Sequence, residues 1–218
     1  MRSGFDVKLE HLNNDLIRMG GLIEEAIANS IKALHDCNKP LAESIIKNDR
    51  VIDDIEKSIE SQSLAIILRE QPVAKDLRKV SAALKMVTDM ERIADNAADI
   101  AEIFLTSGTV FSLQPKSEIR EMAEKVIIMV SDAVTAFVKT DLTLAKIVMD
   151  RDDEIDALFN LVKNNLISEL KFEKGNYDVA IDTLMIAKYL ERIADHAVNI
   201  CEWVEFFETG EYKKTQII

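Results

Sequence analysis

Carboxylates spaced four residues apart are the feature of this sequence that most directly suggests chemistry. Because an α-helix has about 3.6 residues per turn, carboxylates with this spacing stack on one side of a helix. Their oxygens are hard ligands of the kind that Mg, Ca, Mn or Fe prefer, and zinc also accepts them. The sets are Asp49 and Asp53, then Glu91, Asp95 and Asp99, then Asp152 and Asp156, and finally Glu191 and Asp195 with Asn199 in the third place.

The acidic rows are electrostatically unfavourable, and their recurrence calls for a counter-charge. Like charges at this spacing destabilise an isolated helix by about 0.2–0.5 kcal/mol per pair. Arg92 and Arg192 adjoin the rows but are expected to project about 100° away from the preceding glutamate. Each row lies at the edge of an apolar stripe, where a neighbouring helix can bring a second row close. We therefore expect one cation-binding face in each half of the chain. The alternative is that the rows are solvated helix surfaces.

Catalytic constellations are not readable in the sequence. It has no nucleophile, base and orienting group at a recognisable spacing, and no glycine-rich phosphate loop. A carboxylate-bridged di-iron ferroxidase is the alternative from another class, but it uses Glu-x-x-His pairs. The residues three positions before the histidines are Lys8, Lys32 and Ile193. We therefore predict no enzymatic activity, with the ferroxidase and a metal-free helical scaffold as alternatives.

The elements that position these carboxylates are predicted to be long helices. Only six glycines and three prolines occur in 218 residues, and the prolines fall where the helical pattern pauses. Between them, apolar residues recur at i, i+3 and i+4, which predicts helices at about 5–36, 40–70 and 73–107. Gly20 and Gly21 interrupt the first of these helices without an evident reason.

The second half of the chain repeats the pattern of the first. A shift of 103 positions lays Asp49 and Asp53 over Asp152 and Asp156, and a shift of 100 aligns two copies of Glu-Arg-Ile-Ala-Asp. The chain is therefore predicted to be all-α: two pseudo-symmetric three-helix bundles of long antiparallel helices, produced by an internal duplication. We assign 1–107 to the first bundle, 108–117 to a linker and 118–218 to the second bundle.

Net charge narrows the possible partners. With 39 acidic and 27 basic residues the formal charge is −12, which disfavours nucleic acids and anionic membrane surfaces. No apolar stretch approaches the roughly 20 residues that span a bilayer, and the first residues lack the apolar region of a signal peptide. We expect a cytoplasmic protein without nucleic-acid binding or membrane insertion, in which Cys37 and Cys201 are ordinary buried thiols.

At the Glu-Arg-Ile-Ala-Asp repeats the sequence resembles the PhoU family of phosphate-transport regulatory proteins. The matching segments are Asp49 to Asp53, Glu91 to Asp99, Asp152 to Asp156, Glu191 to Asn199 and the closing Glu202 to Glu211. The resemblance implies paired three-helix bundles whose acidic motifs hold iron or other metal ions in some members. Asn199 departs from the pattern, since its counterpart is Asp99, and implies a weaker second site.

The same resemblance implies a role and partners. Proteins of this family act as negative regulators when phosphate is plentiful. They are thought to link the ATPase of the phosphate-specific ABC transporter to a phosphate-sensing histidine kinase, which would bring this protein to the inner face of the membrane. A homodimer is a further expectation, and Fe, Zn, Mg, Mn and Ca all remain candidate ions.

Overall fold

Six long helices make up almost all of the structure, a computed structural model that describes residues 2–107, 117–171, 176–212 and 215–216. The helices are α1 (Arg2–His35), α2 (Lys39–Glu70), α3 (Ala74–Thr106), α4 (Ser117–Lys139), α5 (Leu142–Lys171) and α6 (Tyr177–Thr209). A short antiparallel ribbon of β1 (Glu211–Tyr212) and β2 (Thr215–Gln216) follows α6. No helix in the described ranges is long and apolar enough to span a bilayer.

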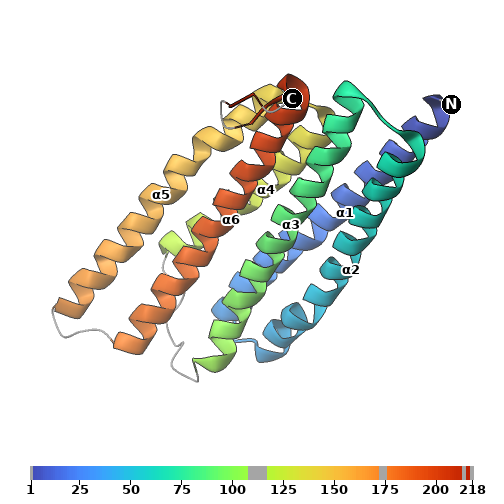
Figure 1. Cartoon of the computed structure of the whole chain (residues 1–218). Helices are drawn as coiled ribbons and strands as arrows, with labels where there is room; N and C mark the ends of the chain where they lie inside the picture. The colour runs from blue at the N-terminus through green and yellow to red at the C-terminus, as the bar shows by residue number, and fades with distance from the viewer. Residues whose placement is uncertain (1, 108–116, 172–175, 213–214, 217–218) are drawn as a thin grey trace.

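The helices form two layers (Figure 1). Helices α5, α6, α3 and α2 lie side by side in that order, and α4 and α1 pack behind them. Helices α1, α2 and α3 form one three-helix bundle, and α4, α5 and α6 form the other. Helices α3 and α6 meet at the centre, where the two bundles have their most extensive contact.

The second helix of each bundle begins with the same kind of capping hydrogen bond. Asn38 accepts a hydrogen bond of 3.1 Å from the Leu41 amide, and Asp141 accepts one of 3.0 Å from Leu144. Such side-chain oxygens satisfy amides that the first turn of a helix leaves without partners. The residue before each cap, Cys37 and Thr140, has a positive φ of 51° and 57° respectively. Both loops therefore reverse the chain in the same way, which aligns α2 and α5 equivalently in their bundles.

Polar contacts along α3 and α6 follow an approximate twofold axis. Asp89 on α3 accepts a hydrogen bond of 3.2 Å from the Asn199 side chain on α6. At the other end of the contact, the Tyr189 hydroxyl on α6 is hydrogen-bonded to the Asp99 carboxylate on α3. A shift of 100 positions converts Asp89 to Tyr189 and Asp99 to Asn199. The duplicated helices therefore pack against each other antiparallel, with equivalent residues at equivalent places.

The glycine pair in α1 has a packing explanation at one of its two positions. Gly20 is buried, and a Cβ at that position would lie 3.3 Å from a methyl group of Val134 on α4. Gly21 is exposed and has no neighbour within 4 Å of such a Cβ. Gly20 therefore allows α1 and α4 to approach closely, whereas the structure gives no reason for Gly21.

The predicted fold class is confirmed, and the helix boundaries agree to within a few residues. Buried side chains of all six helices form one continuous hydrophobic core. The division at 107 and 118 stays a prediction, and nearly all of the predicted linker lies outside the described residues. The prediction for the cysteines is half wrong: Cys201 is buried, but Cys37 is exposed in the turn that ends α1. A turn residue with a positive φ lies outside the periodic pattern that places core residues.

Candidate cation-binding faces

The first acidic face is formed by α2 and α3, which bring together rows from two helices. Asp49 on α2 is partly buried, and burial raises its pKa to about 6, assisted by the negative charges of Asp95, Asp53 and Asp99. A carboxylate whose pKa rises for both reasons is short of positive charge in its surroundings. Asp49 therefore lies within electrostatic reach of Asp95 and Asp99 on α3, and the predicted gathering of these acids around a cation stays a prediction.

Glu91 lies in the same face but has a local counter-ion. Its side chain is 17% exposed, and burial together with Asp95 raises its pKa to about 7. Arg92 opposes this rise: its Nε lies 3.3 Å from Glu91 Oε2 and its Nη1 lies 2.7 Å from Asp95 Oδ2. The expectation that Arg92 projects away from the row is therefore wrong. Its long side chain, 57% exposed, curls back along the helix surface to reach both carboxylates.

The second acidic face, between α5 and α6, repeats the first. Burial raises the pKa of Asp152 to about 6, with Asp195 as the largest charge contribution and smaller ones from Asp156 and Glu191. One buried oxygen of Asp152, Oδ1, has no hydrogen-bond partner among the described residues. Glu191 pairs with Lys188, one turn earlier on α6. Each face therefore combines a partly buried acid on one helix with an acid held by a basic residue on the next.

The third positions of the two rows, Asp99 and Asn199, lie at the contact between α3 and α6. Asp99 is bonded to Tyr189, and Asn199 donates to Asp89. Together with Arg92, Arg192 and their neighbours, both residues line an open polar groove between the two helices. Asp99 also contributes to the raised pKa of Asp49, so it lies within electrostatic reach of the first face. The side-chain nitrogen of Asn199, in contrast, donates its hydrogen bond to Asp89 in the opposite bundle.

Sequence reasoning missed Asp89, which connects the two bundles. Its carboxylate accepts hydrogen bonds of 2.8 Å from His196 Nδ1, with that nitrogen protonated, and of 3.2 Å from Trp203 Nε1, in addition to the bond from Asn199. The side chain is 15% exposed. The sequence carries no signal for these bonds, because Asp89 and its partners are more than 100 positions apart and no spacing rule relates them. The repeat shows only that Asp89 and Tyr189 occupy equivalent positions. Asp89 therefore stabilises the contact between the bundles.

The donor set suits a hard cation, but the structure does not hold a preformed site. Within the described residues, no three His, Cys, Asp or Glu side chains come close enough together to bind one metal ion. The carboxylates of each face do interact electrostatically across helices, and the buried Asp152 Oδ1 has no hydrogen-bond partner in the described part of the chain. A divalent cation would supply the charge that these oxygens lack. Binding would require side-chain rotations and release of Arg92 or Lys188.

The fold and the faces define a class: an acidic helical protein built from two repeated three-helix bundles, with one carboxylate face in each. The family model described as "PhoU domain" matches the chain twice, at residues 16–104 and 119–204. The chain belongs to the PhoU family.

Curated relatives are similar over nearly the whole chain. The phosphate-specific transport system accessory protein PhoU homolog of Clostridium acetobutylicum is 36% identical over 211 residues, covering 96% of each chain. The protein of the same name from Zymomonas mobilis is 37% identical over 207 residues, covering 95% of this chain and 87% of the relative. The similarity therefore spans both bundles.

Solved structures agree with the fold. The crystal structure of PhoU from Pseudomonas aeruginosa has a TM-score of 0.88 and 30% identity, covering 95% of this chain and all of that one. The phosphate transport system regulatory protein PhoU from Streptococcus pneumoniae also has a TM-score of 0.88, with 28% identity, and covers 95% and 98% of the two chains.

Proposed function

We propose that this protein is a negative regulator of phosphate uptake and of phosphate-starvation genes, acting as an adaptor. Its partners in this proposal are the ATPase of a phosphate-specific ABC transporter and a phosphate-sensing histidine kinase. Family membership supports the connection to phosphate transport, since relatives carry that system in their names. The observation that carries the adaptor role is that both acidic faces belong to the same four-helix layer. Two equivalent acidic surfaces carried by one layer of helices would suit basic partners.

We further propose that each face binds divalent or trivalent cations, with Fe, Zn, Mg, Mn and Ca as candidates. The first face would use Asp49, Asp53, Glu91 and Asp95, with Asp99 at its edge, and the second Asp152, Asp156, Glu191 and Asp195. A bound cation would neutralise the face and change which charges a partner meets. The internal pairs of Arg92 and Lys188 support the metal-free alternative, in which these basic residues alone hold the acids.

In this proposal the protein has no catalytic activity. It acts in the cytoplasm, at the inner face of the membrane when bound to the transporter. The acidic faces belong to the layer of α2, α3, α5 and α6. The other layer, formed by α1 and α4, would remain available for contact with a second copy in a homodimer.

The adaptor role is tested by deleting the gene in its host and measuring a phosphate-starvation reporter in phosphate-rich medium. We expect derepression of the reporter and its reversal by the wild-type gene on a plasmid. Unaltered reporter expression in the deletion strain would contradict the regulatory role. Co-purification of the tagged protein then tests whether the transporter ATPase and the kinase both bind to it.

A further inference from the structure

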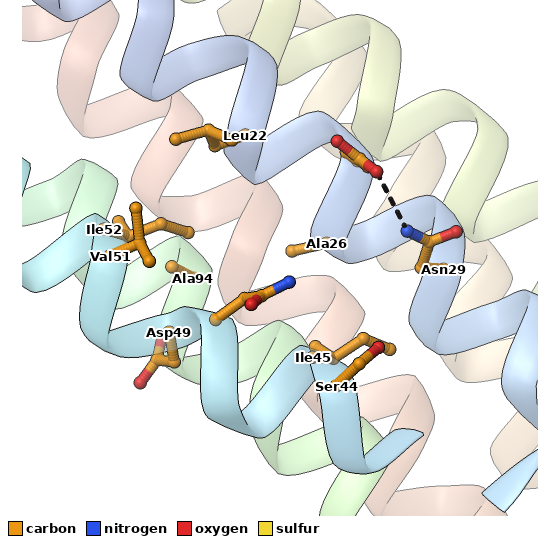
Figure 2. Close-up of a pocket in the computed structure, with 11 residues that line it drawn as sticks. Leu22, Ala26, Asn29, Ser44, Ile45, Asp49, Val51, Ile52 and Ala94 are labelled. Carbon is orange, nitrogen blue, oxygen red and sulfur yellow. Dashed lines mark hydrogen bonds between the residues drawn. The ribbon is translucent and has the colours of Figure 1, made fainter. Parts of the chain in front are cut away.

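A pocket lies in the first bundle between α1 and α2, with α3 at its base. Its volume is about 250 Å³. Figure 2 shows Leu22 and Ala26 from α1, Ile45 and Ile52 from α2, and Ala94 from α3 among the side chains that surround it. Asn29 and Asp49 lie on opposite sides of this apolar part (Figure 2). The pocket therefore has an apolar interior and a polar rim.

The equivalent place in the second bundle is bridged by two ion pairs. Arg151 Nη1 lies 2.5 Å from Asp132 Oδ2, and Lys125 Nζ lies 2.6 Å from Glu154 Oε2, so both pairs join α4 to α5. A shift of 103 positions aligns these four charged residues with neutral residues that line the pocket. The aligned positions are Leu22 with Lys125, Asn29 with Asp132, Asn48 with Arg151 and Val51 with Glu154.

The size of one lining side chain also differs between the two bundles. Ala26 lines the pocket, whereas its counterpart Met129 is completely buried in the second bundle. A methionine side chain fills space that an alanine leaves open. The first bundle thus has small or neutral residues where the second has a large core residue and two bridging ion pairs. The residues that line the pocket therefore differ from their counterparts in an otherwise matching repeat.

The charged residues that line the pocket are acidic. Among the described residues that line the pocket, the charged ones are Glu25 and Asp49. Glu25 accepts a hydrogen bond of 3.5 Å from the Asn29 side chain, and both residues line the pocket from α1. A long apolar stem suits the interior, and a positive group with several donors suits the carboxylate and amide oxygens at the rim. The volume is below the roughly 300–1,000 Å³ of ordinary small-molecule sites, which favours a single side chain.

We propose that this pocket receives an arginine side chain of a protein partner, with its methylenes on the apolar interior and its guanidinium at the rim. The proposal rests on the adaptor role, because that role supplies the protein partner. Arginine is frequent among the anchor residues that dominate the energetics of protein interfaces. The pocket would fix the position of a partner that the acidic faces attract less specifically.

The test uses N-acetyl-arginine methylamide and its neutral isostere N-acetyl-citrulline methylamide, titrated separately into the ¹⁵N-labelled full chain and followed by NMR. We expect saturable shifts around Ala26 and Ile52 with the arginine compound, and at least about fivefold weaker binding of the citrulline compound. Equal affinity for the two compounds, or shifts spread over the surface without saturation, would overturn the proposal.

Two variants locate the binding. The pair Asn29→Asp with Asn48→Arg installs the ion pair of the second bundle without changing net charge, and should abolish binding of the arginine compound. Glu25→Gln should weaken it about fivefold, whereas Glu43→Gln, an exposed site on α2, should not. Wild-type affinity in the double variant would exclude this pocket. If the double variant also restores repression in the deletion strain, the regulatory role stands without the pocket.

Discussion

Partial burial distinguishes Asp49 and Asp152 from exposed acids of the second face such as Asp156 and Asp195. Asp49 and Asp152 occupy equivalent positions on α2 and α5, and burial raises the pKa of each to about 6. In both cases, carboxylates on the neighbouring helix add to the effect. Both repeats therefore carry a partly buried acid whose charge other carboxylates oppose, and a bound cation would offset that charge.

These pKa values predict how stability depends on pH. The pKa of Asp49 rises from 3.8 to about 6 on folding, so the folded protein binds protons more tightly than the unfolded chain. The free energy of unfolding should therefore fall as the pH rises through this window. Asp49→Asn should reduce the fall in melting temperature between about pH 4.5 and pH 7. Asp54→Asn, an exposed site on the same helix, is the control, and an equal effect of both variants would contradict the assignment.

At the residue scale, the sequence predicted the acids but not their partners. Spacing by four residues places carboxylates on one helix side, and that expectation needs only helix geometry. The rotamer of Arg92, which brings it to Glu91 and Asp95, depends on a flexible side chain and has no sequence signature. The bond from Asn199 to Asp89 depends on how α3 and α6 pack, which becomes visible only in three dimensions.

Among the elements, α1 shows how a helix accommodates a close neighbour. Gly20 faces Val134 on α4, and Gly21 faces solvent one position later. Glycine costs a helix interior about 1 kcal/mol relative to alanine because it loses more backbone freedom on folding. At Gly20 this cost permits the contact between α1 and α4, whereas at Gly21 the structure shows no compensating contact.

The two glycines should respond differently to alanine. Gly21→Ala should raise the free energy of unfolding by about 0.5–1 kcal/mol, because the added methyl group meets nothing within 4 Å. Gly20→Ala should give less stabilisation or none, since its methyl group lies 3.3 Å from Val134. Urea unfolding of both variants measures the difference. A larger gain at Gly20 than at Gly21 would show that α1 and α4 can separate freely.

Helix positions were predictable because each helix carries its own signal. Apolar residues at helical spacing and a polar cap such as Asn38 mark an element within a single stretch of sequence. The pocket beside α2 had no comparable signal. It depends on Asn29 and Asn48 from two helices, and only the comparison with Asp132 and Arg151 shows that a bridge is absent there.

The whole molecule is two repeats that share one core. The contact between α3 and α6 is the most extensive between any two helices, and the core continues through it. Its polar bonds, such as Asp89 with Asn199 and Asp99 with Tyr189, relate the halves by an approximate twofold axis. Each bundle therefore covers an apolar surface of the other, which the assignment of two separate domains does not take into account.

An isolated half should not remain a folded monomer. Residues 1–107 alone would expose the surfaces of α1 and α3 that pack against α4 and α6 in the full chain. We expect this fragment to pair with a second copy, because the repeats present equivalent surfaces to each other. Analytical ultracentrifugation with circular dichroism measures both mass and helicity. A cooperatively unfolding helical monomer would instead support two independent domains with the predicted boundary.

In the whole molecule, we propose that each half gathers its carboxylates into one cation-binding face. Calorimetric titration of Mn²⁺ into chelator-treated protein tests it most directly, using Glu91→Ala with Asp95→Ala for the first face and Glu191→Ala with Asp195→Ala for the second. We predict that each double variant loses the binding of one face and keeps wild-type helicity. Identical Mn²⁺ binding by the wild type and both variants would contradict the claim.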